Sequence, residues 1–212
     1  MTGAARWDNP SPRHRGFTLA ELVMSLAVSS VVLAAAAALA YAVCHAWSKS
    51  EDINEVVSSG RNGMVRMSDR IRSARAIGYV APGVLMLWRQ DANEDGQVNR
   101  NELTLLQVDP ATGRLNEGQL LFPAGTSQAV IDSHSTALTA AQFTAAPVVS
   151  QLRGDAFFAE GPLAEYVQDV TWIVDAAPPA TRLVQAQLTL TKDALTQVLH
   201  AGMALRAPKE PE

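Results

Sequence analysis

An uninterrupted apolar segment runs from Phe17 to Cys44 and carries a single formal charge, on Glu21. The segment contains neither glycine nor proline, and its many leucine, alanine and methionine residues favour helix. As a helix it would be about 42 Å long at ~1.5 Å per residue, which exceeds the ~30 Å hydrocarbon core of a bilayer. The pattern therefore predicts a membrane-spanning helix over residues 17–44.

The helical periodicity continues beyond the apolar segment, with apolar or small residues at intervals of three and four, which is typical of an amphipathic helix. These residues are Ile53, Val57, Gly60, Met64, Met67, Ile71 and Ala74. Residues 45–77 are therefore predicted as the second half of one long stem helix that ends near Ala76, with stop signals at Gly78 and Pro82-Gly83. Five arginines lie off the apolar stripe, against Asp69 alone: Arg61, Arg66, Arg70, Arg72 and Arg75. We favour a solvated face for them; contact with acidic patches of other subunits or with lipid headgroups is the alternative.

The remainder, residues 78–212, alternates in the manner of strands and predicts a mainly antiparallel β-sheet head. The predicted strands are Val84–Arg89, Leu103–Val108, Arg114–Phe122, Tyr166–Val174, Arg182–Thr191 and Thr196–Arg206. Residues 123–162 are weakly patterned and are predicted as a long loop with a strand near Ala141–Thr144. The expected fold class is α+β, with a long N-terminal helix packed on the sheet.

Composition and charge narrow the choice of function. The chain is 48% hydrophobic and 18% charged, with a formal net charge of −4, so nothing in its overall charge favours nucleic acid as a partner. A single cysteine, Cys44, excludes an internal disulfide. Basic residues Arg6, Arg13 and Arg15 precede the apolar segment against only Asp8, so by the positive-inside rule residues 1–16 are expected in the cytoplasm and the head across the membrane.

A cleaved signal sequence or a plain anchor accounts less well for the apolar segment. A secretory signal has an apolar region of about 7–15 residues, which is shorter than this segment. A lipoprotein signal would place a small residue before its cysteine, whereas Val43 precedes Cys44. A plain membrane anchor explains the hydrophobicity but not Glu21, because a carboxylate at mid-bilayer costs about 2.5–3.5 kcal/mol.

The residues around Glu21, Arg15-Gly16-Phe17-Thr18-Leu19-Ala20-Glu21-Leu22, resemble the processing site of type IV prepilins and type II secretion pseudopilins. The resemblance implies that a prepilin peptidase cleaves after Gly16, removes residues 1–16 as a leader, and methylates the new amine of Phe17. Glu21 is then the fifth residue of the mature chain. In a low-dielectric surrounding its carboxylate would pair with the N-terminal amine of a neighbouring subunit during assembly.

Within the family, residues 163–170 (LAEYVQDV) and the closing strands are similar to J-type minor pseudopilins and related minor pilins. This similarity implies a minor subunit of a type II secretion pseudopilus or type IV pilus. Such a subunit is held in the inner membrane by one span, carries its head in the periplasm, and reaches the filament through an inner-membrane assembly platform and contacts with other pilin subunits. The alternative is a single-pass anchored domain that binds calcium or another ligand without polymerising.

A twelve-residue segment, residues 91–102, has the ligand spacing of an EF-hand calcium loop. Side-chain oxygens would come from Asp91, Asn93, Asp95, Asn99 and Glu102, the backbone carbonyl from Gln97, and the sharp turn from Gly96. The flanks are predicted as strands, so we expect a loop between two strands, with Ca²⁺ holding it rigid. The alternative is a polar hairpin built on Asp95-Gly96 that needs no ion.

Catalytic motifs are not evident. The histidines His14, His45, His134 and His200 are scattered, and none belongs to an HExxH motif, a Gly-x-Ser-x-Gly elbow or a nucleotide-binding glycine loop. We therefore expect a protein whose work is assembly and not catalysis.

Overall fold

The computed structural model describes residues 16–205. The chain divides into two compact units, Met1–Ser50 and Glu51–Glu212, and helix α1 (Leu19–Ser73) contributes to both. Most of the predicted leader, including Arg15, and Arg206 at the end of the last predicted strand lie outside the described residues.

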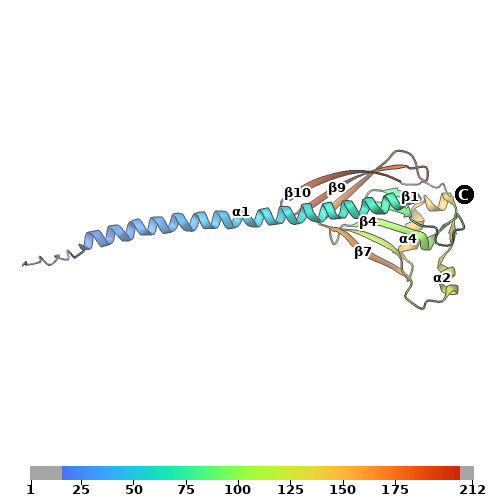
Figure 1. Cartoon of the computed structure of the whole chain (residues 1–212), viewed down its shortest axis with the longest axis horizontal. Helices are drawn as coiled ribbons and strands as arrows, with labels where there is room; N and C mark the ends of the chain where they lie inside the picture. Colours follow the sequence, from blue (N-terminus) through green and yellow to red (C-terminus); the bar gives the residue numbers. More distant parts are fainter. Residues whose placement is uncertain (1–15, 206–212) are drawn as a thin grey trace, which may run out of the picture. The chain divides into compact units, whose positions relative to one another are not determined.

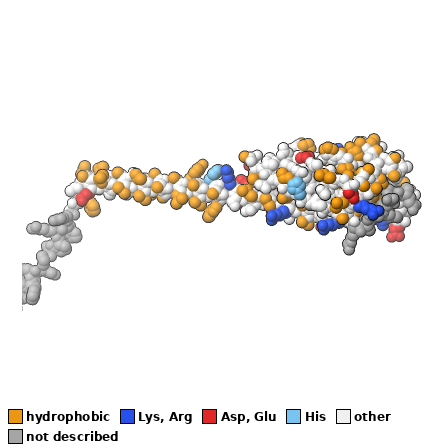
Figure 2. All heavy atoms as spheres, turned by 90° about the horizontal axis from the view of Figure 1, so that it is seen from above, with side chains coloured by type: hydrophobic (Ala, Val, Ile, Leu, Met, Phe, Trp, Pro, Cys, Tyr) orange, Lys and Arg blue, Asp and Glu red, His pale blue; other side chains and the backbone are white. Residues whose placement is uncertain are grey.

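In the first unit, every described side chain is exposed, and hydrophobic side chains dominate its surface (Figure 2). Within residues 16–205, α1 is the one helix with a stretch long and apolar enough to cross a membrane. Its serine hydroxyls are satisfied by the helix itself: Ser25 Oγ donates to Leu22 O at 2.9 Å and Ser30 Oγ to Ala27 O at 2.8 Å. Such internal bonding suits a helix in lipid, where no water is present to take these hydrogen bonds.

In the second unit, α1 ends at Ser73, earlier than the predicted end near Ala76. The physical reason is strand pairing. The Arg75 amide donates to Trp88 O at 2.7 Å, and Ala76 pairs with Trp88 as the first residue of strand β1. Backbone groups that would have extended the helix are thus used by the sheet.

Two antiparallel sheets make up most of the second unit. The five-stranded sheet has the order β1-β2-β4-β5-β7, and the three-stranded sheet the order β10-β9-β8. The strands are β1 (Ala76–Ala81), β2 (Val84–Trp88), β4 (Leu103–Asp109), β5 (Arg114–Leu120), β7 (Phe158–Glu165), β8 (Val167–Val174), β9 (Leu183–Lys192) and β10 (Leu195–Ala204). A short pair, β3 (Val98–Asn99) with β6 (Ala137–Leu138), and a 3-10 turn, η1 (Arg100–Glu102), lie in the connections.

The six predicted strands are confirmed to within two residues at each described end, as β2, β4, β5, β8, β9 and β10. Strand β1 was not predicted, and the helix ends at Ser73, before the stop signal predicted at Gly78. Gly78 lies inside β1, where the Phe143 ring packs so closely that a Cβ on residue 78 would sit 2.4 Å from it. Gly83, the other predicted stop signal, lies in the turn between β1 and β2, where its φ of 68° is one that glycine adopts without strain.

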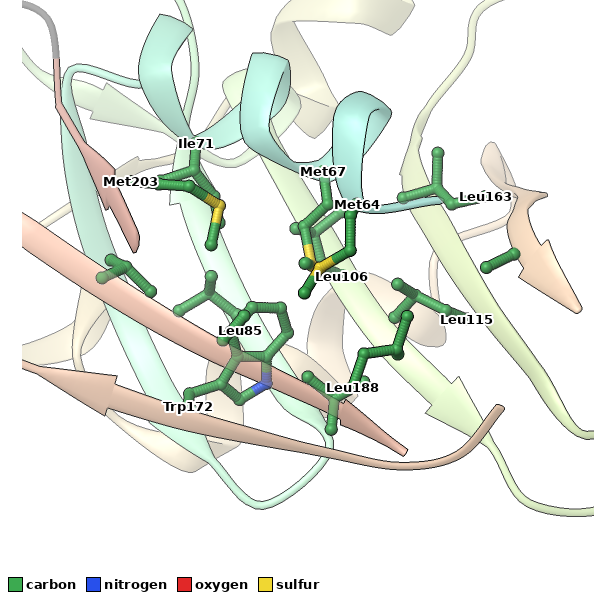
Figure 3. Close-up of a cluster of buried hydrophobic side chains, with 14 of the residues drawn as sticks. Met64, Met67, Ile71, Leu85, Leu106, Leu115, Leu163, Trp172, Leu188 and Met203 are labelled. Atoms are coloured by element: carbon green, nitrogen blue, oxygen red, sulfur yellow. The ribbon is translucent and has the colours of Figure 1, made fainter. Parts of the chain in front are cut away.

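The main core forms where α1 packs against both sheets. Figure 3 shows Met64, Met67 and Ile71 of α1 facing Leu106 and Leu188 from the two sheets. In Figure 1, β9 and β10 lie on one side of α1 and β4 and β7 on the other. Gly63 allows the close approach, because a Cβ at this position would lie 2.5 Å from the Cβ of Ala164 on β7.

A polar cluster fastens the β9–β10 hairpin to α1. Lys192 Nζ lies 2.8 Å from Asp52 Oδ1 and 2.6 Å from Glu55 Oε2, and the Tyr166 hydroxyl also donates to Glu55. The hydrogen bonds to Asp52 and Glu55 raise the pKa of Lys192, so this amine stays protonated at any ordinary pH. The pairing fixes the hairpin at the start of the head-side half of the helix.

The prediction of a loop over 123–162 is wrong. This region forms three helices, α2 (Gln128–His134), α3 (Ala140–Phe143) and α4 (Ala146–Arg153), and then enters β7; the strand predicted near Ala141–Thr144 is instead α3. For α3 and α4 the reason is burial on the second face of the five-stranded sheet, where Phe143 and Leu152 pack in one cluster with Met86 and Trp88. A weakly patterned sequence thus folds because a neighbouring surface offers burial.

Candidate assembly and metal-binding sites

The candidate processing and assembly site lies at the start of α1. Gly16 and Phe17 precede the helix, and the Phe17 side chain is 84% exposed. Glu21 lies in the first helical turn, where its carboxylate Oε2 accepts the Thr18 amide and the Thr18 hydroxyl, each at 3.0 Å. The Thr18 hydroxyl in turn accepts the Glu21 amide at 3.3 Å.

This reciprocal pair is a capping box, the arrangement in which a Thr and a Glu three residues later satisfy backbone donors at a helix start. The contribution of Thr18 was not predicted, although the Thr-x-x-Glu spacing was available in the sequence to find it. The Glu21 carboxylate is stabilised in two ways: it accepts the hydrogen bonds from Thr18, and it lies at the positive end of the helix dipole. Glu21 thus has a local structural role in addition to the intersubunit role predicted for it.

The calcium-type loop lies between β2 and β4, so the prediction of flanking strands is confirmed. Asp91 and Glu102, its first and last residues, are buried, with relative exposures of 8% and 4%. Glu102 Oε1 accepts the Ala92 amide at 2.6 Å, and Oε2 accepts Trp88 Nε1 at 3.0 Å and the Asn99 amide at 3.2 Å. Glu102 therefore closes the loop by binding both of its ends.

The middle of the loop turns as its spacing requires. Gly96 has a φ of 76°, which supports the role predicted for it. Asp91 Oδ2 accepts the Gly96 amide at 3.2 Å, while Asp95 accepts the Gln97 amide at 2.7 Å and hydrogen bonds from the side chains of Asn93 and Asn99. The side chains of Asn93, Asp95 and Asn99 are therefore joined by hydrogen bonds. Asp91 is connected to the same loop through the Gly96 amide.

The positively charged side chain of Arg75 binds this loop. Arg75 Nη1 lies 2.8 Å from Asp91 Oδ2, and the Arg75 guanidinium is 5.5 Å from the centre of the Trp88 ring. Among residues 16–205, no three His, Cys, Asp or Glu side chains gather closely enough to hold a metal by themselves. A calcium ion would therefore need the amide and backbone oxygens of Asn93, Gln97 and Asn99 as well, and it would share Asp91 with Arg75.

The predicted solvated arginine face is wrong for two of its members. Arg70 Nε lies 2.8 Å from Glu117 Oε1, with Arg89 Nη1 3.4 Å from the same oxygen, so Arg70 links α1 to β5. Arg75 lies after the helix and binds Asp91. Both partners are acids from elsewhere in the chain, which helical periodicity does not identify.

A cluster around Asp155 was not predicted from the sequence. The Asp155 carboxylate, whose side chain is 2% exposed, lies 2.7 Å from His134 Nδ1 and 3.3 Å from Arg100 Nη2. Burial raises the pKa of Asp155, but hydrogen bonds from the Phe157 amide and His134 and the charge of Arg100 outweigh that effect, so the pKa is lowered overall. The cluster joins η1, α2 and the turn after α4.

The N-terminal segment is the part of the chain for which comparison gave a match. A family model described as the prokaryotic N-terminal methylation motif matches residues 11–37, a range that includes Gly16, Phe17 and Glu21. Comparisons with curated proteins and with solved structures gave no match. The matched motif supports a likeness to type IV pilin-like proteins, and the long apolar helix packed on antiparallel sheets is a pilin-like architecture.

Proposed function

We propose that this chain is a minor pilin or pseudopilin subunit. A prepilin peptidase would cleave it after Gly16 and methylate Phe17, and an assembly platform in the inner membrane would pass it into a pseudopilus or pilus. The observation that carries the proposal is the methylation motif at residues 11–37, with Glu21 in the first turn of an exposed apolar helix. The J-type character suggested by residues 163–170 belongs to this proposal.

Glu21 can serve its helix and a neighbouring subunit at the same time. A carboxylate has about four lone-pair positions. Oε2 accepts two hydrogen bonds from Thr18, so capacity remains for the amine of another subunit. After cleavage that amine is the N-terminus of Phe17, which stays cationic when methylated. Attraction between the two charges is far stronger in a lipid or protein surrounding than in water, which favours pairing within the membrane.

The proposed topology follows from the same segment. With the basic leader in the cytoplasm, α1 crosses the inner membrane once and the β-rich head lies in the periplasm. Contacts with other pilin-like subunits would then form along α1. The part of α1 that belongs to the first unit carries mostly apolar side chains on its surface (Figure 2). Both units would act by packing and not by catalysis.

We further propose that the loop over residues 91–102 binds Ca²⁺ in the head. The donor set of carboxylate, amide and carbonyl oxygens is the chemistry that calcium prefers, and the positive φ of Gly96 supports the loop conformation. An ion there would hold rigid the connection between β2 and β4. This loop also favours the second candidate function, an anchored calcium-binding domain that does not polymerise.

The mature N-terminus distinguishes the two functions. Mass spectrometry of the protein extracted from membranes should give an N-terminal peptide that begins with methylated Phe17. An intact Met1, or an N-terminus near Ala42, would contradict the filament function and favour the anchored domain. A Gly16→Val variant, in which the peptidase site is changed and Phe17 is retained, should keep the leader and serves as the control.

A further inference from the structure

The free edge of strand β10 differs from the other free edges of the sheets. Edge strands are usually protected from pairing with other chains by charge, proline, a bulge or short length. β1 has six residues and a register shift, β7 contains Pro162 and two glutamates, and β8 carries Asp169 beside a register shift. β10 pairs with β9 alone among the described residues and has none of these features.

The ten residues of β10, Leu195 to Ala204, include no charged residue and no proline, and they pair with β9 without interruption. The Leu205 amide donates to Arg182 O at 2.9 Å, so residues in phase with Leu205 direct their backbone groups toward β9. The amides of the alternate residues are then directed to the free edge. These are Thr196, Val198, His200, Gly202 and Ala204.

The side chains along this edge leave the core incompletely covered. Leu195, Leu199 and Ala201 pack against the main core but remain partly exposed. Along β10 they alternate with residues whose side chains face away from the core. Another strand beside β10, with apolar residues at every second position, would complete the burial of the core-facing side chains. The free backbone amides and the partly exposed apolar side chains of β10 thus indicate the same binding partner, an extended uncharged segment.

We propose that β10 is a docking edge at which an extended segment of an adjoining filament subunit adds as a fourth strand to the three-stranded sheet. The inference rests on the proposed assembly. A neighbouring subunit is the indicated source because β10 lies beside α1, along which subunits would meet: Gly60 of α1 is close to Leu199. β10 carries no Asp, Glu, Lys or Arg, so it offers a charged segment no electrostatic attraction. An uncharged segment is therefore the better match.

Hydrogen exchange of the full-length protein tests this inference. The protein is compared in detergent micelles and in filaments sheared from cells, where its presence is established separately by mass spectrometry of the mature N-terminal peptide. Strand addition should slow exchange of the outward amides of residues 195–204 by at least about tenfold on assembly. Presence in filaments with unchanged exchange across β10 would overturn the docking edge alone, whereas absence from filaments would overturn the proposed function as well.

A backbone substitution provides the second measurement. Val198→Pro removes an outward amide and obstructs an added strand, but it leaves the β9–β10 hydrogen bonds in place, so proline is tolerated at this position. Val198→Thr keeps the amide and is the matched control. With both variants melting within a few degrees of the natural protein, filament incorporation should fall at least about fivefold for the proline variant only; equal incorporation of both would overturn the proposal.

Discussion

Thr18 and Glu21 hold each other at the start of α1: Glu21 Oε2 accepts the Thr18 amide at 3.0 Å, and Thr18 Oγ1 accepts the Glu21 amide at 3.3 Å. The pair gives Glu21 a structural role within its own helix. A substitution that removes both the cap and the charge therefore does not distinguish which of them assembly needs. Two variants of the same residue separate these effects.

Glu21→Gln should retain the cap, because glutamine also closes a capping box, but should lose attraction for a neighbouring amine. Glu21→Leu loses both. If the carboxylate pairs with another subunit, both variants insert in the membrane and are cleaved, yet both fail to enter filaments. Incorporation is measured in sheared filaments against total membrane protein.

Normal incorporation of Glu21→Gln together with failure of Glu21→Leu would assign Glu21 to capping alone. Thr18→Ala provides the matched control, since it removes the hydroxyl of the cap and leaves the carboxylate. We expect it to weaken the helix start by about 1 kcal/mol and to assemble more efficiently than Glu21→Gln.

Calcium should stabilise the full-length protein in detergent. An ion that binds only the native state adds about 2.7 kcal/mol at a concentration one hundred times its dissociation constant. Thermal unfolding monitored by circular dichroism should therefore occur at higher temperature with calcium than with chelator. Glu102→Gln should abolish the difference, and Asp109→Asn, at the last residue of β4, should keep it. Identical melting of the natural protein in both conditions favours the hairpin without an ion.

Arg75 should compete with calcium for Asp91, because Arg75 Nη1 lies 2.8 Å from Oδ2 of the carboxylate that an ion would bind. Removing this cation in Arg75→Gln should tighten calcium binding by about tenfold, as measured by isothermal titration. Arg61→Gln removes an arginine from the exposed surface of α1 and should leave the affinity unchanged. Weaker binding by Arg75→Gln would mean that Arg75 organises the loop for the ion.

Gly63→Ala should destabilise the head, although alanine favours helix by about 1 kcal/mol over glycine. The added Cβ would lie 2.5 Å from the Cβ of Ala164, which is fixed to the backbone of β7 and cannot rotate away. We expect a net loss of about 1–2 kcal/mol in urea unfolding, the overpacking cost exceeding the gain in helix propensity. The neighbouring exposed position supplies the control, since Asn62→Ala should be neutral or slightly stabilising; an equal gain in both variants would contradict the close packing.

Asp155 should make stability depend on acid. Its pKa is lowered in the folded protein, so its contribution is present above the pKa of aspartate in the unfolded chain and is lost as pH falls through the folded value. Asp155→Asn should cost about 2 kcal/mol at pH 7, and the difference from the natural protein should shrink below about pH 4. Asp69→Asn, at an exposed carboxylate of α1, should show no such convergence; a constant deficit of Asp155→Asn across pH would contradict an ionic role.

The sequence by itself determined the features that depend on neighbours along the chain. The apolar run with its single carboxylate, the period of the helix and the alternation of six strands are local patterns, and each predicted element of this kind is present in the structure. The processing motif and the loop spacing are likewise local. Such patterns specify which face of an element is apolar, but they do not specify what covers it.

Tertiary structure decided the remaining features, because their partners are distant in sequence. Ala76–Ala81 became a strand by pairing with β2, and helices α3 and α4 formed by burying Phe143 and Leu152 on a sheet formed largely by earlier residues. Arg75 pairs with Asp91, and His134 pairs with Asp155. Burial and charge pairing act through space, so a weak local preference gives way wherever the fold provides a surface or a counter-charge.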